Sequence, residues 1–246
     1  MSRLRLFQIR LAASSALLLL VFTLVRMLWY PGAYFTISGV SRQLWVLVGV
    51  IAVVGPALST FVYKPGKKGL VMDLVILAAV EVAVLVAALL VIFQGRPYFS
   101  VFAVDRFEAV ALGEVIGSDV PEALLGRQSD QQQRLVYAQL PEDPERMSAL
   151  IDETVFQGMA DIDRRPEFWK PFSDGIVTVK AAARPLEALL GRDDRRSVAV
   201  NKWLLKSGGS AQDYIVLPLR GRADDAIIIL SADSGYPVAT LAVDPW

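Results

Sequence analysis

The 246-residue sequence contains neither cysteine nor histidine. Disulfide bonds, thiol nucleophiles, zinc sites built from the usual ligands and histidine general bases are therefore excluded together. A chain without cysteine suits an oxidising compartment, but many cytosolic domains share this property. The composition thus removes several classes of enzyme without fixing the location of the protein.

Acidic residues are almost missing from the first 96 positions. Up to Arg96 there are nine basic and two acidic residues, a net charge of +7, whereas the rest of the chain holds 16 basic and 23 acidic residues, a net charge of −7. The excess of the 54% hydrophobic content over an average soluble domain also lies before Arg96. We therefore predict a transmembrane domain over residues 1–96 and a separate polar domain over residues 97–246. Because an acidic domain repels phosphates, we expect no nucleic-acid partner.

Three apolar stretches in the first region are long enough to cross a membrane. They cover residues 11–30, 44–62 and 70–93. Each has about 19 to 24 residues, which at 1.5 Å per residue spans the hydrocarbon layer of a bilayer. The first stretch could be read as a cleaved signal peptide, but no small-residue cleavage pattern follows it, and Arg26, Trp29 and Tyr30 are typical of an interfacial anchor. We predict three retained helices, with a kink at Gly55-Pro56.

The cations beside these helices predict their orientation. Three arginines precede the first helix and three lysines separate the second from the third: Arg3, Arg5, Arg10, Lys64, Lys67 and Lys68. The positive-inside rule places both groups in the cytoplasm. The loop over residues 31–43 holds only Arg42 and is predicted to lie outside. An odd number of helices then makes this a multi-pass inner-membrane protein with a cytoplasmic N-terminus and a periplasmic C-terminal domain.

Two acidic residues lie in the third predicted helix. Asp73 is near its cytoplasmic end, where a pair with Lys67 or Lys68 is the ordinary explanation. Glu81 is about midway, where an ionisable group costs several kcal/mol unless it is neutralised, paired or facing protein. Two interpretations remain open for Glu81. It is either a protonated carboxyl bonded to a serine or threonine of a neighbouring helix (Ser59, Thr60, Ser14 or Ser15), or a polar contact for a partner's transmembrane helix.

The third helix also carries a stripe of small residues. Ala79, Ala83 and Ala87 recur every four residues, so they share one face on which another helix can pack closely. That other helix either belongs to the same three-helix bundle or to a partner protein. We treat these alanines, together with Asp73 and Glu81, as candidate partner contacts.

The pattern after residue 96 is typical of an α+β domain with mostly antiparallel strands. Strands are predicted over residues 98–105, 107–112, 134–140, 214–220, 226–231 and 238–243, all rich in Val, Ile, Tyr and Phe. The clearest helix covers residues 144–160, with an apolar stripe expected to face the core, and a shorter one is predicted over residues 184–190. Asp233-Ser234-Gly235 is a turn signal between two strands.

Candidate catalytic groups are weak in this domain. Many carboxylates are present, including Asp161, Asp163 and the pairs Asp193-Asp194 and Asp224-Asp225, but solvation explains carboxylates in turns and on polar helix faces. Asp161-Ile162-Asp163 lacks the glycine and glutamate of a calcium loop. Ser207-Gly208-Gly209-Ser210 lacks the lysine of a phosphate-binding loop. We therefore predict a protein that is not an enzyme and that has no cofactor and no metal.

Three segments resemble a known family. Residues 95–108 (GRPYFSVFAVDRFE), residues 214–222 (YIVLPLRGR) and the terminal Asp244-Pro245-Trp246 are similar to the TfpX/TfpZ family of type IV pilin accessory proteins. The resemblance implies an inner-membrane protein that binds its major pilin, and in turn other inner-membrane pilus assembly proteins, and that promotes pilus assembly or display. It supplies no active site. Asp105 and Arg106, in its most specific segment, are candidate partner contacts, although a bond between Arg106 and a neighbouring carboxylate is the simpler interpretation.

Two other functions remain open at this stage. A small ion-coupled transporter could use Glu81 and Asp73, but three helices provide a thin pathway unless the chain oligomerises. A membrane-tethered periplasmic sensor would need a cytoplasmic output domain, which a partner would have to supply. In every case membrane lipid is a permanent partner of the chain.

Overall fold

A computed structural model describes residues 3–64, 66–117, 119–125, 133–190 and 195–246. The chain forms two compact units. The first comprises Met1–Trp29 and Gly39–Gly95, and the second comprises Tyr30–Ser38 and Arg96–Trp246. The second unit therefore takes in a short segment between the first two long helices, which the sequence analysis treats only as a connecting loop.

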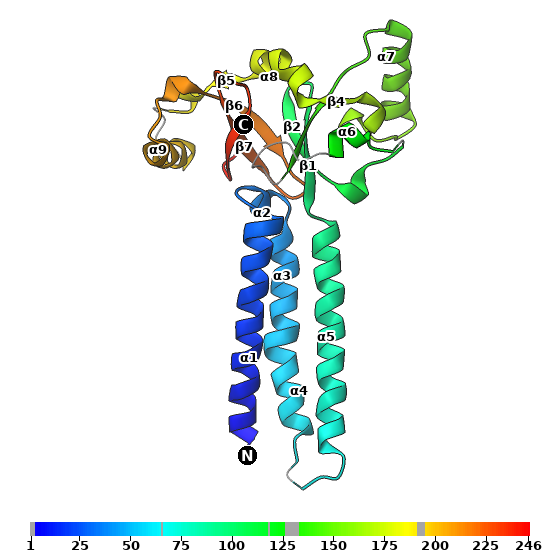
Figure 1. Cartoon of the computed structure of the whole chain (residues 1–246), viewed down its shortest axis with the longest axis vertical. Helices are drawn as coiled ribbons and strands as arrows, with labels where there is room; N and C mark the ends of the chain where they lie inside the picture. The colour runs from blue at the N-terminus through cyan, green and yellow to red at the C-terminus, as the bar shows by residue number, and fades with distance from the viewer. Residues whose placement is uncertain (1–2, 65, 118, 126–132, 191–194) are drawn as a thin grey trace. The chain divides into compact units, whose positions relative to one another are not determined.

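Three long apolar helices make up the first unit (Figure 1). The first is α1 (Arg3–Leu24) with a π-helical turn at Val25–Trp29. The second comprises α3 (Val40–Val48), a π-helical segment at Gly49–Val54 and α4 (Gly55–Val62), and the third is α5 (Leu70–Gln94). All three are long and apolar enough to cross a membrane. The prediction of three membrane helices is confirmed.

The second span changes its helical geometry next to Pro56. Proline lacks the N–H group that an α-helix would bond to the carbonyl four residues earlier, so a regular helix would lose a bond there. The chain instead follows a π-helical path over Gly49–Val54 and resumes as α4, with Pro56 in the first turn of that helix. The irregularity predicted from Gly55-Pro56 thus takes the form of a π-helical segment.

An eight-stranded mixed sheet forms the centre of the second unit. Its strands are β1 (Pro97–Ala103), β2 (Arg106–Ala111), β3 (Arg134–Ala138), β4 (Trp169–Pro171), β5 (Arg184–Pro185), β6 (Tyr214–Arg220), β7 (Asp225–Ser231) and β8 (Pro237–Leu241). The strand order is β4-β3-β1-β2-β6-β7-β8, with β5 pairing β6. β1 pairs β3 and β2 pairs β6 in parallel, and the remaining pairs are antiparallel. The predicted α+β class with mostly antiparallel strands is confirmed.

Both faces of the sheet are buried. Along β7, Ala226, Ile228 and Leu230 belong to one apolar cluster, whereas Ile227 and Ile229 belong to another on the opposite face. The first cluster includes residues of α2 (Tyr34–Ile37) and α8 (Ile176–Ala182). The opposite face is covered in two places, by α6 (Glu122–Leu125) and α7 (Pro144–Ile151) over the β1 side and by α9 (Arg195–Ser207) over the β7 side. A strand buried on both faces reads as a continuous apolar run, as β7 does.

Two expectations about local structure are wrong, and two helices are not predicted. The helix predicted over residues 184–190 is instead the short strand β5 followed by a 3-10 turn at Leu186–Leu189. The helix predicted over residues 144–160 ends as α7 at Ile151 and continues as a π-helical turn over Asp152–Phe156. Two helices, α8 and α9, are not predicted from the sequence, because α8 has only seven residues and the outer face of α9 mixes apolar residues with cations.

The segment between the first two long helices, Tyr30–Ser38, packs in the core of the second unit. Ala33, Tyr34 and Ile37 are at most 5% exposed and pack in the cluster that contains Ile228. The backbone N–H of Ala33 donates to Thr240 Oγ1 over 3.0 Å, and the Tyr34 hydroxyl donates to Ser100 Oγ over 3.1 Å. Burial raises the pKa of Tyr34 to about 12, so this hydroxyl remains a donor at physiological pH.

A glycine makes room for this segment. A side chain at Gly221 would place its Cβ 2.5 Å from the Ile37 carbonyl oxygen, which no real Cβ tolerates. The same oxygen accepts the N–H of Ala223 over 2.8 Å. Gly221 is thus required by the close approach of two chain segments that are far apart in the sequence.

Candidate partner-contact site

An ion pair joins the first and third long helices in the first unit. Arg10 Nη2 of α1 donates to both carboxylate oxygens of Glu81 in α5, at 2.8 and 2.9 Å, and Arg10 Nε donates to Ser59 Oγ of α4 over 3.1 Å. Ser59 in turn donates to the Gly55 carbonyl. One arginine therefore connects all three helices through hydrogen bonds. In a bilayer core such pairing lowers the cost of placing either charge there.

The close approach of the helices at this point depends on Gly55. A Cβ at that position would lie 2.5 Å from Glu81 Oε1. The carboxylate thus occupies the space that a side chain of α4 would fill. A glycine is therefore favoured at position 55, because any larger residue there would clash with the Glu81 carboxylate in its present position in the middle of the third helix.

The interpretation of Glu81 as a protonated carboxyl bonded to Ser59, Thr60, Ser14 or Ser15 is wrong in its choice of partner. The carboxylate bonds Arg10, and Ser59 bonds the arginine. From the sequence alone, Arg10 is identified only as a cation that flanks the first helix. The side chain of Glu81 is 17% exposed and faces the other two helices. Its role as a partner contact stays a prediction.

The alanine stripe lies on the outside of the three-helix unit. Ala79, Ala83 and Ala87 are all exposed, because the residues of α5 that face the neighbouring helices, such as Glu81 and Leu85, occupy the other side. Packing of this stripe inside the bundle is therefore wrong, and the stripe is free to meet lipid or another helix. Asp73 pairs with Lys67, which is one of the two partners predicted for it from the sequence.

Charged residues at the β1–β2 hairpin bond each other. Arg106 Nε donates to Glu108 Oε1 over 2.8 Å, and its Nη1 lies 3.2 Å from Asp105 Oδ1, while Phe107 is fully buried. This confirms the simpler interpretation of Arg106. The hydrogen bond to Glu108 is the main cause that raises the pKa of Arg106, whereas burial raises the pKa of Glu108. A contact of Asp105 and Arg106 with a partner stays a prediction.

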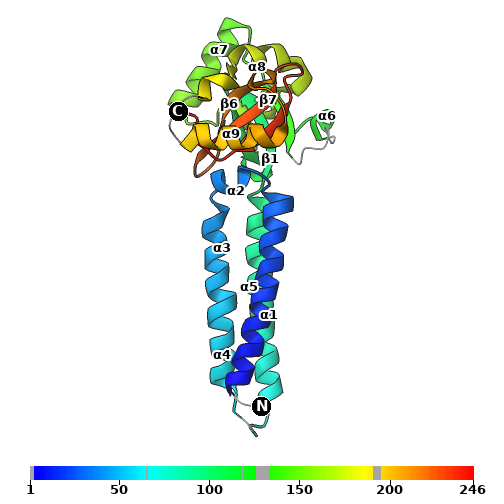
Figure 2. The same ribbon diagram turned by 90° about the vertical axis from the view of Figure 1, so that its left-hand side faces the viewer.

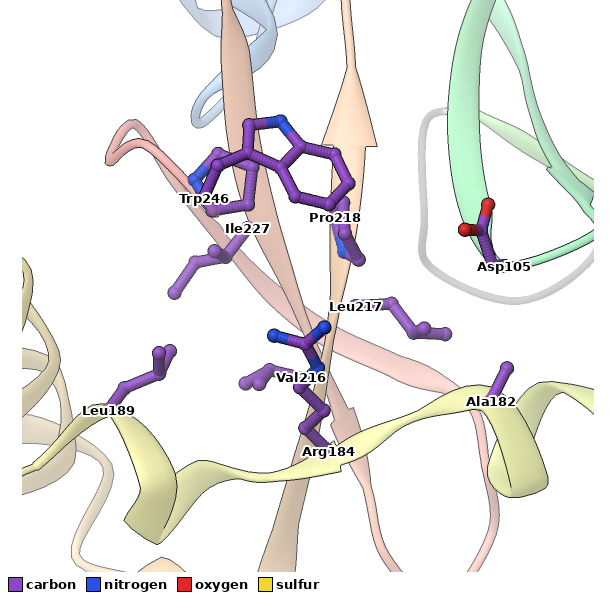
Figure 3. A pocket seen from close by; sticks show the side chains of 10 residues that line it. Asp105, Ala182, Arg184, Leu189, Val216, Leu217, Pro218, Ile227 and Trp246 are labelled. Carbon is purple, nitrogen blue, oxygen red and sulfur yellow. The ribbon is translucent and has the colours of Figure 1, made fainter.

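Beside this hairpin lies a small groove whose lining is drawn in Figure 3. Its volume is about 90 Å³, and Val216, Leu217 and Trp246 supply apolar walls while Asp105 and Arg184 supply opposite charges. The indole of Trp246 donates to Asp225 Oδ2 over 3.2 Å, although 58% of this residue is exposed. Drug-sized ligands need about 300 Å³ or more, so the groove can accept no more than a side chain.

A larger exposed apolar surface lies where α7 ends. We define the α7 patch as four residues that are 43% to 78% exposed: Ile151, Val155, Phe156 and Met159. Ile151, Val155 and Met159 belong to the apolar stripe predicted from the sequence, but only Leu150 of the helix is fully buried. Contiguous exposed apolar residues on a folded domain are typical of a protein-binding surface. The change from α-helix to π-helix at Asp152 is the kind of irregularity that often occurs at functional sites.

A network of ion pairs fixes the turn that carries the α7 patch. Arg165 is 4% exposed; its Nη1 lies 2.7 Å from Glu153 Oε2 and its Nε lies 2.8 Å from Glu167 Oε1. Arg146 also reaches Glu153. The bond from Arg165 holds the pKa of Glu153 below its usual range. Because Glu153 is tied inward, the π-helical turn presents Val155 and Phe156 to solvent.

The described residues offer no site for a metal ion. Within the ranges that the structure describes, no three acidic side chains converge closely enough to bind one. Asp161 caps the following turn with its own side chain, and Asp163 is largely buried next to Arg164. Asp193 and Asp194 lie outside the described residues.

Comparisons with known proteins find distant relatives over most of the chain. Two fimbrial assembly proteins of Dichelobacter nodosus, of serogroups I and E1, are each 24% identical to the chain, over 231 and 223 residues; in both cases the alignment covers 88% of this chain and 86% of the relative. The chain is thus distantly similar to fimbrial assembly proteins over most of its length. A third such protein, of serogroups C1 and C2, matches over 102 residues, or 41% of this chain. No family model and no solved structure matches the chain.

Proposed function

We propose that this protein is an inner-membrane accessory factor of type IV pilus assembly, of the TfpX/TfpZ kind, that binds its major pilin and promotes pilus assembly or display without catalysing a reaction. The observation that carries the proposal is the similarity to fimbrial assembly proteins over 88% of the chain. An alignment over 88% of the chain extends into both units, so it supports a common role for the whole chain.

Two surfaces of the chain suit such a partner. The exposed alanines of α5 allow a transmembrane helix to approach closely, since small side chains let backbones pack within van der Waals contact. The α7 patch offers exposed apolar area to a globular domain, with Phe156 78% exposed at its centre. We assign the pilin's membrane helix to the first surface and its globular domain to the second.

The proposal includes an orientation. The arginines near the start of α1 and the lysines between α4 and α5 favour a cytoplasmic location for the N-terminus, so the second unit would be periplasmic. A reporter that is active only in the periplasm, fused behind Trp246, should be active. Activity of a cytosolic reporter at the same position would overturn the orientation and, with it, the assignment of the α7 patch to the pilin's globular domain.

The function is tested by deleting the gene and counting surface pili after complementation. Phe156→Ser should reduce pilus number while the protein remains at wild-type level, because it removes the most exposed member of the α7 patch. Val177→Ser, which changes an 82% exposed valine of α8 outside the patch, is the matched control and should restore normal numbers. Equal piliation by the deletion strain and the wild type would overturn the proposal.

The membrane surface is tested in the same strain. Ala83→Leu enlarges the middle of the alanine stripe and should lower pilus number by preventing close helix approach. Val82→Leu adds one methylene group at a neighbouring exposed position of α5, away from the stripe, and should have no effect. If both variants behave alike, the stripe is not a specific contact. Complementation with mismatched pilins then identifies which pilin the protein serves.

A further inference from the structure

Helix α9 is attached to the second unit by one face only. Val200 is fully buried and Ser197 is 4% exposed, and both face the sheet side of the helix. The Trp203 ring packs edge-on against Tyr214, with 4.9 Å between the ring centroids. Figure 2 shows α9 lying across β6 and β7. The helix is therefore firmly placed, and its other face is presented to the surroundings.

The outer face of α9 combines apolar and basic side chains. Val198 is 65% exposed and Leu205 is 87% exposed, and their spacing of seven residues, two helical turns, puts them in one line. Arg195, Lys202 and Lys206 are exposed along one side of that line. The helix contains four cations, the fourth being Arg196, and no acidic residue.

This charge is opposite to that of the rest of the domain. Residues 97–246 have a net charge of −7, so the part of the domain outside α9 is more strongly acidic still. An exposed helix with an apolar line flanked by lysine and arginine is typical of segments that lie in the plane of a membrane interface. The contrast gives the domain one side that an anionic surface attracts and other sides that it repels.

We propose that the outer face of α9 rests on the anionic headgroups of the same membrane that the chain's own helices cross. The connection to the membrane is short, because α5 ends at Gln94 and β1 begins at Pro97, which leaves only two residues between the last long helix and the sheet. Lys202 and Lys206 would contact lipid phosphates, and Val198 and Leu205 would enter the interface. The contact is independent of the role in pilus assembly.

The lack of cysteine allows a direct test on the full-length protein. Leu205→Cys, labelled with an environment-sensitive fluorophore, is placed at one copy per lipid nanodisc, made either of phosphatidylcholine or of phosphatidylcholine with phosphatidylglycerol. We expect a blue-shifted emission and weaker quenching by neutral acrylamide in the anionic discs. The double change Lys202→Glu with Lys206→Glu should abolish this difference, because it reverses the charge that meets the headgroups.

A label at an equally exposed site elsewhere supplies the control. Val177 on α8 is 82% exposed, and a fluorophore attached to Val177→Cys should show the same emission in both kinds of disc. The proposal is overturned if the label at position 205 does not respond to anionic lipid, or if the label at position 177 responds equally. An unresponsive position 205 would leave α9 to a protein partner, whereas pilus counts would still decide the proposed function.

Discussion

Arg10 and Glu81 show how single residues can hold a membrane bundle together. Each charge alone would be costly in hydrocarbon, and the pair with its bond to Ser59 satisfies both. The side chains are only 28% and 17% exposed, so the pair is screened far less than a surface salt bridge. The geometry also restricts the transporter hypothesis, because Glu81 is engaged by an arginine with two hydrogen bonds.

A double-mutant cycle measures this pair. Arg10→Leu or Glu81→Leu alone should lower the free energy of unfolding by about 3 to 5 kcal/mol, because each leaves the other charge unpaired. The double variant should lose much less than the sum of the two. Unfolding is followed in detergent micelles for all four proteins. Strictly additive losses would show that the two side chains do not interact in the folded protein.

The burial of Asp163 predicts that the stability of the folded protein changes with pH. Burial, and secondarily the charge of Asp161, raises its pKa above the ordinary value of 3.8, against the opposing effect of Arg164. A carboxyl whose folded pKa is raised contributes stability that is complete below the unfolded pKa and is lost as the pH rises through the folded pKa. The ionised carboxylate of Asp163 therefore lowers the free energy of unfolding at neutral pH.

Replacing Asp163 by Asn should remove this loss of stability. Relative to the wild type, Asp163→Asn should be most favourable at pH 7 and should lose that advantage as the pH falls to about 3.8, the ordinary value. Urea unfolding of the full-length protein in micelles, followed by tryptophan fluorescence, measures the difference at each pH. Asp119→Asn, at an exposed position, controls for loss of a surface charge. A difference that grows as the pH falls would contradict the assigned direction.

At the scale of elements, α7 contributes a buried residue to the core, and the turn that follows it carries exposed residues that we assign to binding. Leu150 is 4% exposed in the core, whereas Phe156 is 78% exposed. Leu150→Ala should cost about 2 to 5 kcal/mol of unfolding free energy, and Phe156→Ser should change it by less than about 0.5 kcal/mol. Thermal unfolding in micelles compares the two. A large loss for Phe156→Ser would mean that the α7 patch is part of the core, and it could not then be assigned to a partner.

The elements that the sequence predicts correctly are those whose signal is local. Each membrane helix is one continuous apolar run, and β7 is an unbroken Ala-Ile-Ile-Ile-Leu stretch, so composition alone identifies them. The two-residue strand β5 exists only because β6 lies beside it, and no local pattern marks it. The amphipathic helix α9 is missed because its outer face mixes Val198 and Leu205 with lysines.

The candidate site depends on contacts that spacing could not indicate. Arg10 and Glu81 are 71 positions apart, and only the arrangement of the helices brings them together. The segment 30–38 carries a readable signal, because Tyr34, Phe35 and Ile37 are unusual in a solvated loop. Its burial under Gly221, however, requires the folded sheet.

At the scale of the whole molecule, the chain enters the second unit twice. Tyr30–Ser38 and the region from Arg96 onward form one core, so the domain is not continuous in sequence. Ile37→Asp in the full-length protein should therefore destabilise the sheet domain, although the substitution lies between two membrane helices. A buried isolated carboxylate costs several kcal/mol.

Hydrogen exchange localises that effect. The amides of β6 and β7 should lose protection in Ile37→Asp, whereas those of α5, which belongs to the other unit, should keep it. Ser38→Asp, one residue further and only half-buried, is the neighbouring control and should cost less. Unchanged protection of β6 and β7 in Ile37→Asp would contradict the docking of this segment in the core.

Binding of the pilin is the central claim, and crosslinking inside cells measures it most directly. A photoreactive amino acid is placed at Ala83, in the alanine stripe, or at Phe156, in the α7 patch, in cells that make pili. We expect both positions to capture the major pilin, and Val82 and Val177 to capture much less. If neither Ala83 nor Phe156 captured pilin in a strain where the protein is present at normal level, the account would be contradicted.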